Sequence, residues 1–309
     1  MTRSHALRII IAVDDSERSK DAIAFGGALA RAGEASVTAA HAYPWHHLRF
    51  SGTSDANQFF LEESERTLAR MSEPLSDLAD VELRSLPDPS PARGLQALAE
   101  ELEAGLIVVG SSHTGRLGRV LPGSTAERLL HGAPCAVAVV PHGYATAQRH
   151  AVGVIACGWD GSPESDAALL AAEELARTMS ASLRVIRTFQ PTAYAYPPAL
   201  GVAYAHFTQD ARDHANRALE ERLAHVSAGV TMEGELHEGV AAHELGDVCD
   251  TVDLMVLGSR GYGPLEAVLL GGVSGRVVRD AGCPVIVVPN GPRRPDSPLI
   301  AASAAAIAM

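Results

Sequence analysis

The chain contains the same segment twice, and this repeat restricts its fold more than any other feature. Residues 110–141 return 148 residues later as residues 258–289, with 14 of 32 positions identical. Upstream, the sequence IAVDDS at residues 11–16 is echoed by CGWDGS at residues 157–162. A repeat at this spacing predicts two tandem copies of one domain. We expect domains over residues 1–148 and 149–290, followed by a disordered tail over residues 291–309.

Each copy alternates short apolar runs with helical patterns. Strands are expected in the first copy over residues 7–13, 37–43, 81–86, 106–109 and 136–140. Helices are expected between them over residues 16–32, 57–80, 90–104 and 124–131, the last capped by Ser124. The second copy repeats this order. The alternation predicts the α/β class, with a mostly parallel five-stranded sheet and helices on both faces in each copy. The last strands, at residues 137–140 and 285–288, are apolar enough to pair with each other or with a second chain.

Composition excludes several functional classes. Lys and Arg number 25 against 37 Asp and Glu, a net charge of −12, which disfavours binding to nucleic acid or to an anionic membrane. Lys20 is the only lysine and lies outside a GK[ST] context, so a Walker-type phosphate site is excluded. We find no run long enough for a transmembrane helix and no signal-peptide pattern. The four cysteines form no CxxC pair, and we expect a reducing cytoplasm.

Two glycine-rich loops each join a strand to a helix, at residues 110–124 and 258–272. Such a loop presents backbone N–H groups and a helix N-terminus, which together bind phosphate without lysine. The alternative is a long surface turn in which the glycines only permit positive φ. Its occurrence in both copies favours the phosphate interpretation.

An aspartate ends the first strand of each copy, Asp14 and Asp160. A carboxylate at this place can accept hydrogen bonds from ribose hydroxyls. An Asx turn or a helix cap explains it equally well, since Ser16 and Ser162 follow two residues later. No GxGxxG follows the strand, so a Rossmann dinucleotide site is not expected.

These motifs together resemble the universal stress protein family, which joins V-D-x-S after the first strand to G-x-x-G-(x9)-G-[ST] after the fourth. The resemblance covers both halves as far as Pro289. It implies two tandem Rossmann-like domains of the adenine nucleotide α-hydrolase type. It also implies a role in stress adaptation and binding of adenine nucleotide, meaning ATP with or without Mg²⁺. The residues it assigns to the nucleotide are Asp14 and Asp160, then Ala42 and Thr188 near the adenine, and Gly110, Gly123, Ser124, Gly258, Gly261 and Gly271 at the phosphates.

Each half departs from the family pattern at one position. His113 replaces the second glycine in the first half, where it can obstruct the phosphate cleft or contact the ligand. Gly272 replaces the Ser or Thr in the second half, which keeps the backbone N–H and loses one side-chain hydrogen bond.

The function expected from these features is a cytoplasmic sensor or regulator that binds ATP in one or both halves. No catalytic residue and no metal ligand is predicted, and any ATPase activity is expected to be slow. The two domains are expected to pair within the chain, and a homodimer is also open. A nucleotide-free dimerisation module is the alternative. A third class, ATP-using enzymes of the related fold, needs SGGxD[ST] after the first strand, which this chain lacks.

Overall fold

A computed structural model describes residues 7–45, 53–112, 120, 122–147, 151–190, 201–225, 229–259 and 271–289. The expected tail at residues 291–309, together with His113 and Gly261, lies outside these ranges. No helix in the described ranges is both long and apolar enough to cross a membrane.

Strands and helices alternate through both halves, as the sequence predicts. The first half contains β1 (Arg8–Ala12), α1 (Glu17–Gly33), β2 (Ser36–Tyr43), α2 (Thr53–Met71), η1 (Glu73–Leu75), β3 (Val81–Pro87), α3 (Pro91–Glu101), β4 (Leu106–Gly110), α4 (Ser124–Leu129), β5 (Ala136–Val140) and η2 (Tyr144–Thr146). The second contains β6 (Val154–Gly158), α5 (Pro163–Met179), β7 (Ser182–Phe189), α6 (Gly201–Leu223), β8 (Met232–Glu238), α7 (Ala241–Val248), β9 (Leu254–Gly258), α8 (Gly272–Asp280) and β10 (Val285–Val288).

The strands form one continuous ten-stranded sheet in the order β3-β2-β1-β4-β5-β10-β9-β6-β7-β8. Neighbouring strands are parallel within each half, which confirms the predicted class. β5 and β10 join the halves in antiparallel fashion, with Val139 opposite Val285 and Val137 opposite Val287. The two apolar last strands therefore pair with each other inside the chain.

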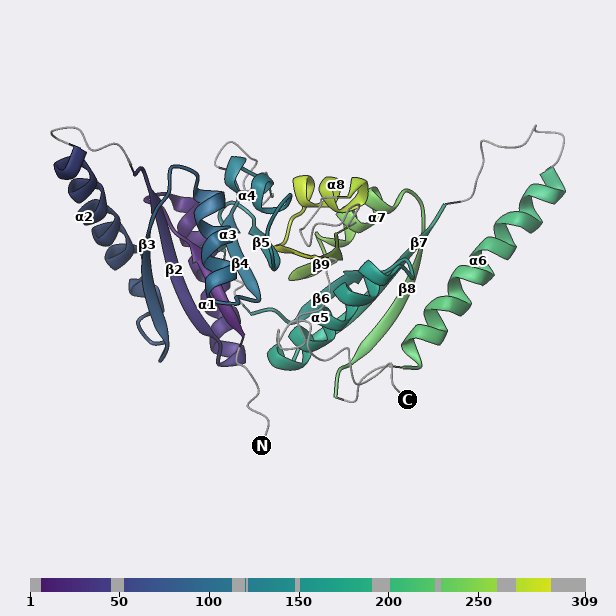
Figure 1. Cartoon of the computed structure of the whole chain (residues 1–309). Coiled ribbons are helices and arrows are strands. Elements are labelled where there is room, and N and C mark those ends of the chain that lie inside the picture. Colours follow the sequence, from purple (N-terminus) through teal and green to yellow (C-terminus); the bar gives the residue numbers. More distant parts are fainter. Residues whose placement is uncertain are drawn as a thin grey trace.

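Helices cover both faces of this sheet (Figure 1). The side chains of β1 alternate between the two faces, with Ile9 and Ile11 in one buried cluster and Ile10 in the other. The cluster of Ile9 includes residues from α1, α2, α5 and α6, whereas that of Ile10 includes residues from α3, α4, α7 and α8. In Figure 1, α2 and α6 lie at the two outer flanks of the molecule. Burial on both faces explains why the strands are nearly continuous apolar runs.

Two predicted helix ends are wrong. The helix expected over residues 57–80 ends at Met71, and a 3-10 turn containing Pro74 follows. Proline has no N–H to continue the helix, and it restricts the residue before it. Ser124 is not the cap of α4: the extended residue Gly123 is the N-cap, and Ser124 is the first helical residue.

The carboxyl group of Glu174 on α5 supplies a test of stability against pH. Its Oε2 atom is buried without a hydrogen-bond partner, and burial raises the pKa of Glu174 to about 7. Because this pKa is raised above the unfolded value, the stabilisation of the protonated form is present at low pH and lost as pH rises through 7. We expect Glu174→Gln to raise the free energy of unfolding by about 1–2 kcal/mol at pH 8 and to change it little at pH 5. Urea unfolding at both pH values measures this, and the exposed Glu100 supplies the control, Glu100→Gln. An equal effect of Glu174→Gln at both pH values would contradict it.

Candidate functional site

Two pockets lie at the carboxyl ends of the parallel strands, one in each half. The first has about 640 Å³ of empty space and the second about 600 Å³. Open α/β sheets bind their ligands at this edge, where the strand order reverses. In each half the reversal lies between the first and fourth strands, β1 and β4 or β6 and β9.

The residues predicted from the first strand and the glycine loop come together in both pockets. Asp14, Ala42, Gly110 and Gly123 line the first pocket. Asp160, Thr188, Gly258 and Gly271 line the second. The remaining walls are largely apolar, from residues such as Val109 and Leu95 in the first pocket and Ile186, Leu245 and Leu257 in the second. Walls of this kind suit a flat heteroaromatic ring, with polar groups at one end.

Two predicted residues lie at the start of a helix instead of in the pocket lining. Ser124 and Gly272 are exposed first residues of α4 and α8. Their neighbours Thr125 and Val273 are in the lining. Ser274 lines the second pocket but is not among the residues assigned to the nucleotide from the sequence; its hydroxyl accepts a hydrogen bond from the N–H of Gly271 (3.1 Å). Its position three residues after the N-cap is the spacing of a capping box and could have indicated it.

The glycines that begin the two loops are required by packing. A Cβ atom at Gly258 would lie 2.5 Å from the carbonyl oxygen of Glu164 in the first turn of α5. The same atom at Gly110 would overlap the carbonyl oxygen of Arg18 in the first turn of α1. Each helix therefore starts directly against the end of the fourth strand. The next backbone N–H groups, of Ser111 and Ser259, are taken by the carbonyls of Val140 and Val288. The first N–H groups of α4 and α8 are further donors at this end of the pockets, because a helix leaves them without intrahelical partners.

Asp14 is held by side chains at the start of α1. Its carboxylate accepts hydrogen bonds from Ser16, from Ser19 (2.7 Å) and from Arg18 Nε (2.8 Å), and Arg18 Nη2 lies 2.5 Å away. Burial opposes the charged carboxylate, but these donors outweigh it and hold the pKa of Asp14 below its usual range. The printed partners of the Asp14 carboxylate are thus side chains of the residues that follow it, and Asp14 also lines the pocket that the ribose interpretation needs.

Asp160 is arranged differently. It is exposed, and its Oδ1 atom accepts a hydrogen bond from the N–H of Ser162 (2.9 Å). Ser162 in turn caps α5 by accepting from the N–H of Ser165 (3.2 Å). The equivalent of Arg18 in this half is Glu164, so no matching ion pair forms.

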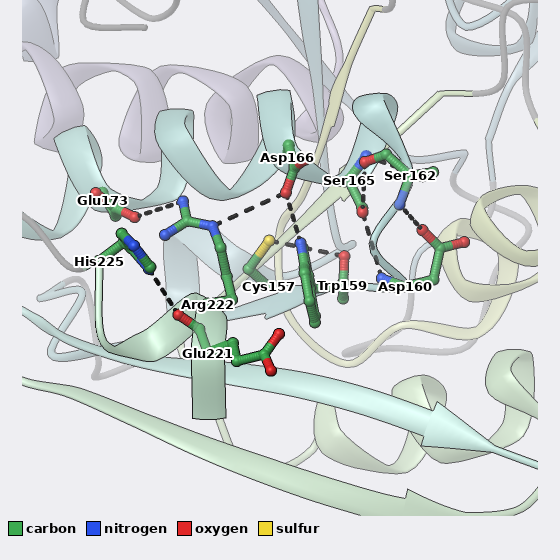
Figure 2. Close-up of polar contacts among 11 residues, drawn as sticks. Cys157, Trp159, Asp160, Ser162, Ser165, Asp166, Glu173, Glu221, Arg222 and His225 are labelled. Atoms are coloured by element: carbon green, nitrogen blue, oxygen red, sulfur yellow. Dashed lines mark hydrogen bonds and ion pairs between the residues drawn. The ribbon is translucent and has the colours of Figure 1, made fainter. Parts of the chain in front are cut away.

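The indole of Trp159, which directly precedes Asp160, is held by a network of polar side chains from α5 and α6 (Figure 2). Its Nε1 donates to Asp166 on α5 at 2.7 Å, and Arg222 Nε on α6 lies 3.8 Å from the same carboxylate. Arg222 also pairs at 3.1 Å with Glu173, whose side chain is 3% exposed. The guanidinium of Arg187 stacks over the Trp159 ring, 4.8 Å from its centroid. Trp159 lines the second pocket but was not among the predicted site residues. Its position directly before Asp160, at the end of a strand, could have indicated it.

His41 also lines the first pocket. Its Nδ1 lies 2.8 Å from the hydroxyl of the fully buried Ser64, which donates to Ser85 (2.8 Å). Burial lowers the pKa of His41, with Asp14 and Asp15 opposing, so the neutral imidazole is favoured. Among the described residues, no three His, Cys, Asp or Glu side chains converge to hold a metal ion.

The fold and the paired pockets define a tandem protein of two α/β halves with matching ligand sites. The family model of the universal stress proteins matches residues 6–141 and 152–289. The chain belongs to the universal stress protein family, as the motifs predict.

Several known proteins resemble the chain along most of its length. Universal stress protein Rv2319c of Mycobacterium tuberculosis is 31% identical over 233 residues, which cover 74% of this chain and 77% of that protein. A universal stress protein of Mycolicibacterium smegmatis is 34% identical over 189 residues, covering 60% of this chain and 62% of that protein. The crystal structure of a universal stress protein from Archaeoglobus fulgidus shares the fold, with a TM-score of 0.70 at 17% identity, covering 93% of this chain and 98% of that one.

Proposed function

We propose that the pockets bind adenine nucleotide, ATP with or without Mg²⁺, and that the protein acts as a stress sensor or regulator in the cytoplasm. The strongest support is that three features meet at both pockets: the aspartate that ends the first strand, the glycines of the loop, and the start of the helix that follows the loop. Asp14 and Asp160 would meet the ribose hydroxyls, and the starts of α4 and α8 would meet the phosphates. The four free, buried cysteines are in keeping with a reducing compartment.

A sensor fits the chemistry of the first pocket better than a fast catalyst. A general base works best when its pKa lies near the working pH. Hydrogen bonds and the Arg18 ion pair hold the pKa of Asp14 below its usual range, so its carboxylate is a weak base. His41 is turned toward Ser64. Turnover of ATP is therefore expected to be slow in this half.

The nucleotide content of the purified protein tests the proposal. The protein is denatured, and released nucleotide is identified by mass and counted by ultraviolet absorbance. We expect one or two adenine nucleotides per chain, or the same stoichiometry when ATP and Mg²⁺ are added in a calorimeter. Asp14→Ala and Asp160→Ala should each remove one site. No released nucleotide and no heat of binding would contradict the proposal.

A nucleotide-free interaction module is the second candidate function. The state of Asp14 favours it for the first half, since Ser16, Ser19 and Arg18 already satisfy this carboxylate without a ligand. The calorimetric titration separates the two candidates, because a module of this kind gives no heat with ATP while retaining its fold.

Restoring the missing hydroxyl should improve the second site. A Cβ atom at Gly272 would have nothing within 4 Å, so Gly272→Ser fits without rearrangement. One additional hydrogen bond of about 1 kcal/mol should tighten ATP binding about fivefold. Trp159 fluorescence, measured in a Trp45→Phe background, follows binding in this half. Gly272→Ala is the matched control, and equal affinity of the Ser and Ala variants would show that the hydroxyl does not reach the ligand.

A further inference from the structure

The first glycine loop contacts the second half of the chain through Val120. The backbone N–H of Val120 donates a hydrogen bond to the carbonyl of Ala281 at 2.9 Å. Ala281 is the C-cap of α8, and both residues are fully buried. They belong to one buried cluster with Val277 and Val278 of α8. A loop of one half is therefore held by the helix end of the other half.

Val120 lies close in the chain to residues that line the first pocket. Residues 121 and 122 alone separate it from Gly123, which is the N-cap of α4 and part of the lining. Thr125, in the first turn of α4, also lines this pocket. Consecutive Cα atoms are about 3.8 Å apart, so the connection from Val120 to α4 is short. A displacement of Val120 is therefore passed on to the helix start at the first pocket.

The other end of α8 lies at the second pocket. Its N-cap Gly271 lines this pocket together with Val273 and Ser274. The hydroxyl of Ser274 accepts a hydrogen bond from the N–H of Gly271 (3.1 Å), which closes the first turn. The helix has 9 residues and a length of about 14 Å, and its backbone hydrogen bonds make it a rigid element. One rigid element thus reaches from the lining of the second pocket to the loop of the first.

We infer that α8 couples the two pockets, with Val120 as the residue that positions the first glycine loop. A phosphate held at the start of α8 fixes the helix, and with it the carbonyl of Ala281 to which Val120 donates. The first loop then loses less freedom when its own ligand binds, so a filled second pocket tightens binding in the first. Linkage makes the effect mutual. The inference rests on the proposed function, since it requires adenine nucleotide in both pockets.

Calorimetry with ATP and Mg²⁺ measures this coupling. Asp160→Ala protein gives the dissociation constant of the first site alone, and Asp14→Ala protein gives that of the second. Without coupling, the product of the two dissociation constants of the intact protein equals the product of the two single-site constants. We expect the product for the intact protein to be about fivefold smaller.

A pair of valine variants identifies the route. In a Val120→Ala background the fivefold difference should disappear, because loss of the buried isopropyl group frees the loop from the end of α8. Val37→Ala removes the same two methyl groups from a buried valine of β2. This control should lose a similar amount of packing and keep the fivefold difference.

Hydrogen exchange tests the same contact without a change at residue 120. In Asp14→Ala protein, ATP fills the second pocket alone. We expect this to slow exchange of the Val120 amide, followed by nuclear magnetic resonance, about fivefold. The amide of Val37 donates to the carbonyl of Asp80 at 3.0 Å, also in the first half, and its exchange should not change.

The outcomes separate the coupling from nucleotide binding itself. If both pockets bind ATP and the product for the intact protein is no smaller than the single-site product, the inference is wrong while nucleotide binding stands. The same holds if only one pocket binds ATP, if a folded Val120→Ala protein keeps the fivefold difference, or if exchange of the Val120 amide is not slowed. If ATP binds neither pocket of the wild-type protein, the proposed function itself fails.

Discussion

Replacing Gly110 or Gly258 by alanine is expected to lower the melting temperature by about 5 °C, the larger effect falling on Gly110. The added methyl would meet the carbonyl of Arg18 or Glu164, which belongs to the backbone of a helix and cannot rotate away. The first turn of α1 or α5 must then move off its strand. Overpacking of this kind costs about 3 kcal/mol, and for a chain of this size that corresponds to the stated change in melting temperature.

The matched controls are glycines of the same two loops. A Cβ atom at Gly272 would have nothing within 4 Å, and one at Gly123 would lie 4.0 Å from the Ser112 side chain. Alanine at either position should change the melting temperature by less than about 2 °C. Thermal unfolding followed by circular dichroism measures all four variants. If the Gly110→Ala and Gly272→Ala proteins have the same melting temperature, the explanation by close packing at Gly110 is wrong.

These glycines show where the sequence is ambiguous. Recurrence of the loop in both halves predicts a shared constraint, and a phosphate is one source of it. The structure adds a second source for Gly110 and Gly258, the close approach of a helix start to the strand end. Two different requirements leave the same residue in the sequence, so the pattern alone cannot separate them.

The fold was predicted where the signal is local. Helix α1 spans Glu17–Gly33, within one residue of the predicted range 16–32, because Ser16 lies at its N-cap and Glu34 ends it in the left-handed conformation. The buried strands could also be predicted, because each appears in the sequence as a short apolar run. Pairing of β5 with β10 could not be derived, since an apolar strand edge accepts any partner in either direction.

The site was predicted in part for the same reason. Asp14 and Asp160 could be placed because the end of the first strand is visible in the sequence. The ion pair of Arg18 with Asp14 joins two residues only four positions apart, across the start of α1. The pairing of Arg222 with Glu173 spans 49 residues and depends on how α6 packs on α5, which the sequence does not reveal.

Arg222→Met is expected to lower the free energy of unfolding by about 3–5 kcal/mol. Glu173 is 3% exposed, and Arg222→Met removes the guanidinium that pairs with its buried carboxylate. Removing both partners, in Arg222→Met with Glu173→Leu, should recover most of this loss, because well-packed apolar side chains can replace a buried pair. Arg66→Met, at an ion pair with both side chains about half exposed, should cost less than about 1 kcal/mol. Urea unfolding measures each variant.

The same change should reach the second pocket through Trp159. Arg222 and Trp159 share the carboxylate of Asp166, so loss of Arg222 leaves Asp166 to the indole alone (Figure 2). The emission maximum of Trp159, isolated by Trp45→Phe, should therefore shift in Arg222→Met and remain unchanged in Arg66→Met. Nucleotide affinity should fall in the second half only, because Val13, Lys20 and Gly27 occupy the matching positions in the first. If Arg222→Met lowers the free energy of unfolding but leaves the Trp159 emission unchanged, then Arg222 stabilises α6 but does not position the site.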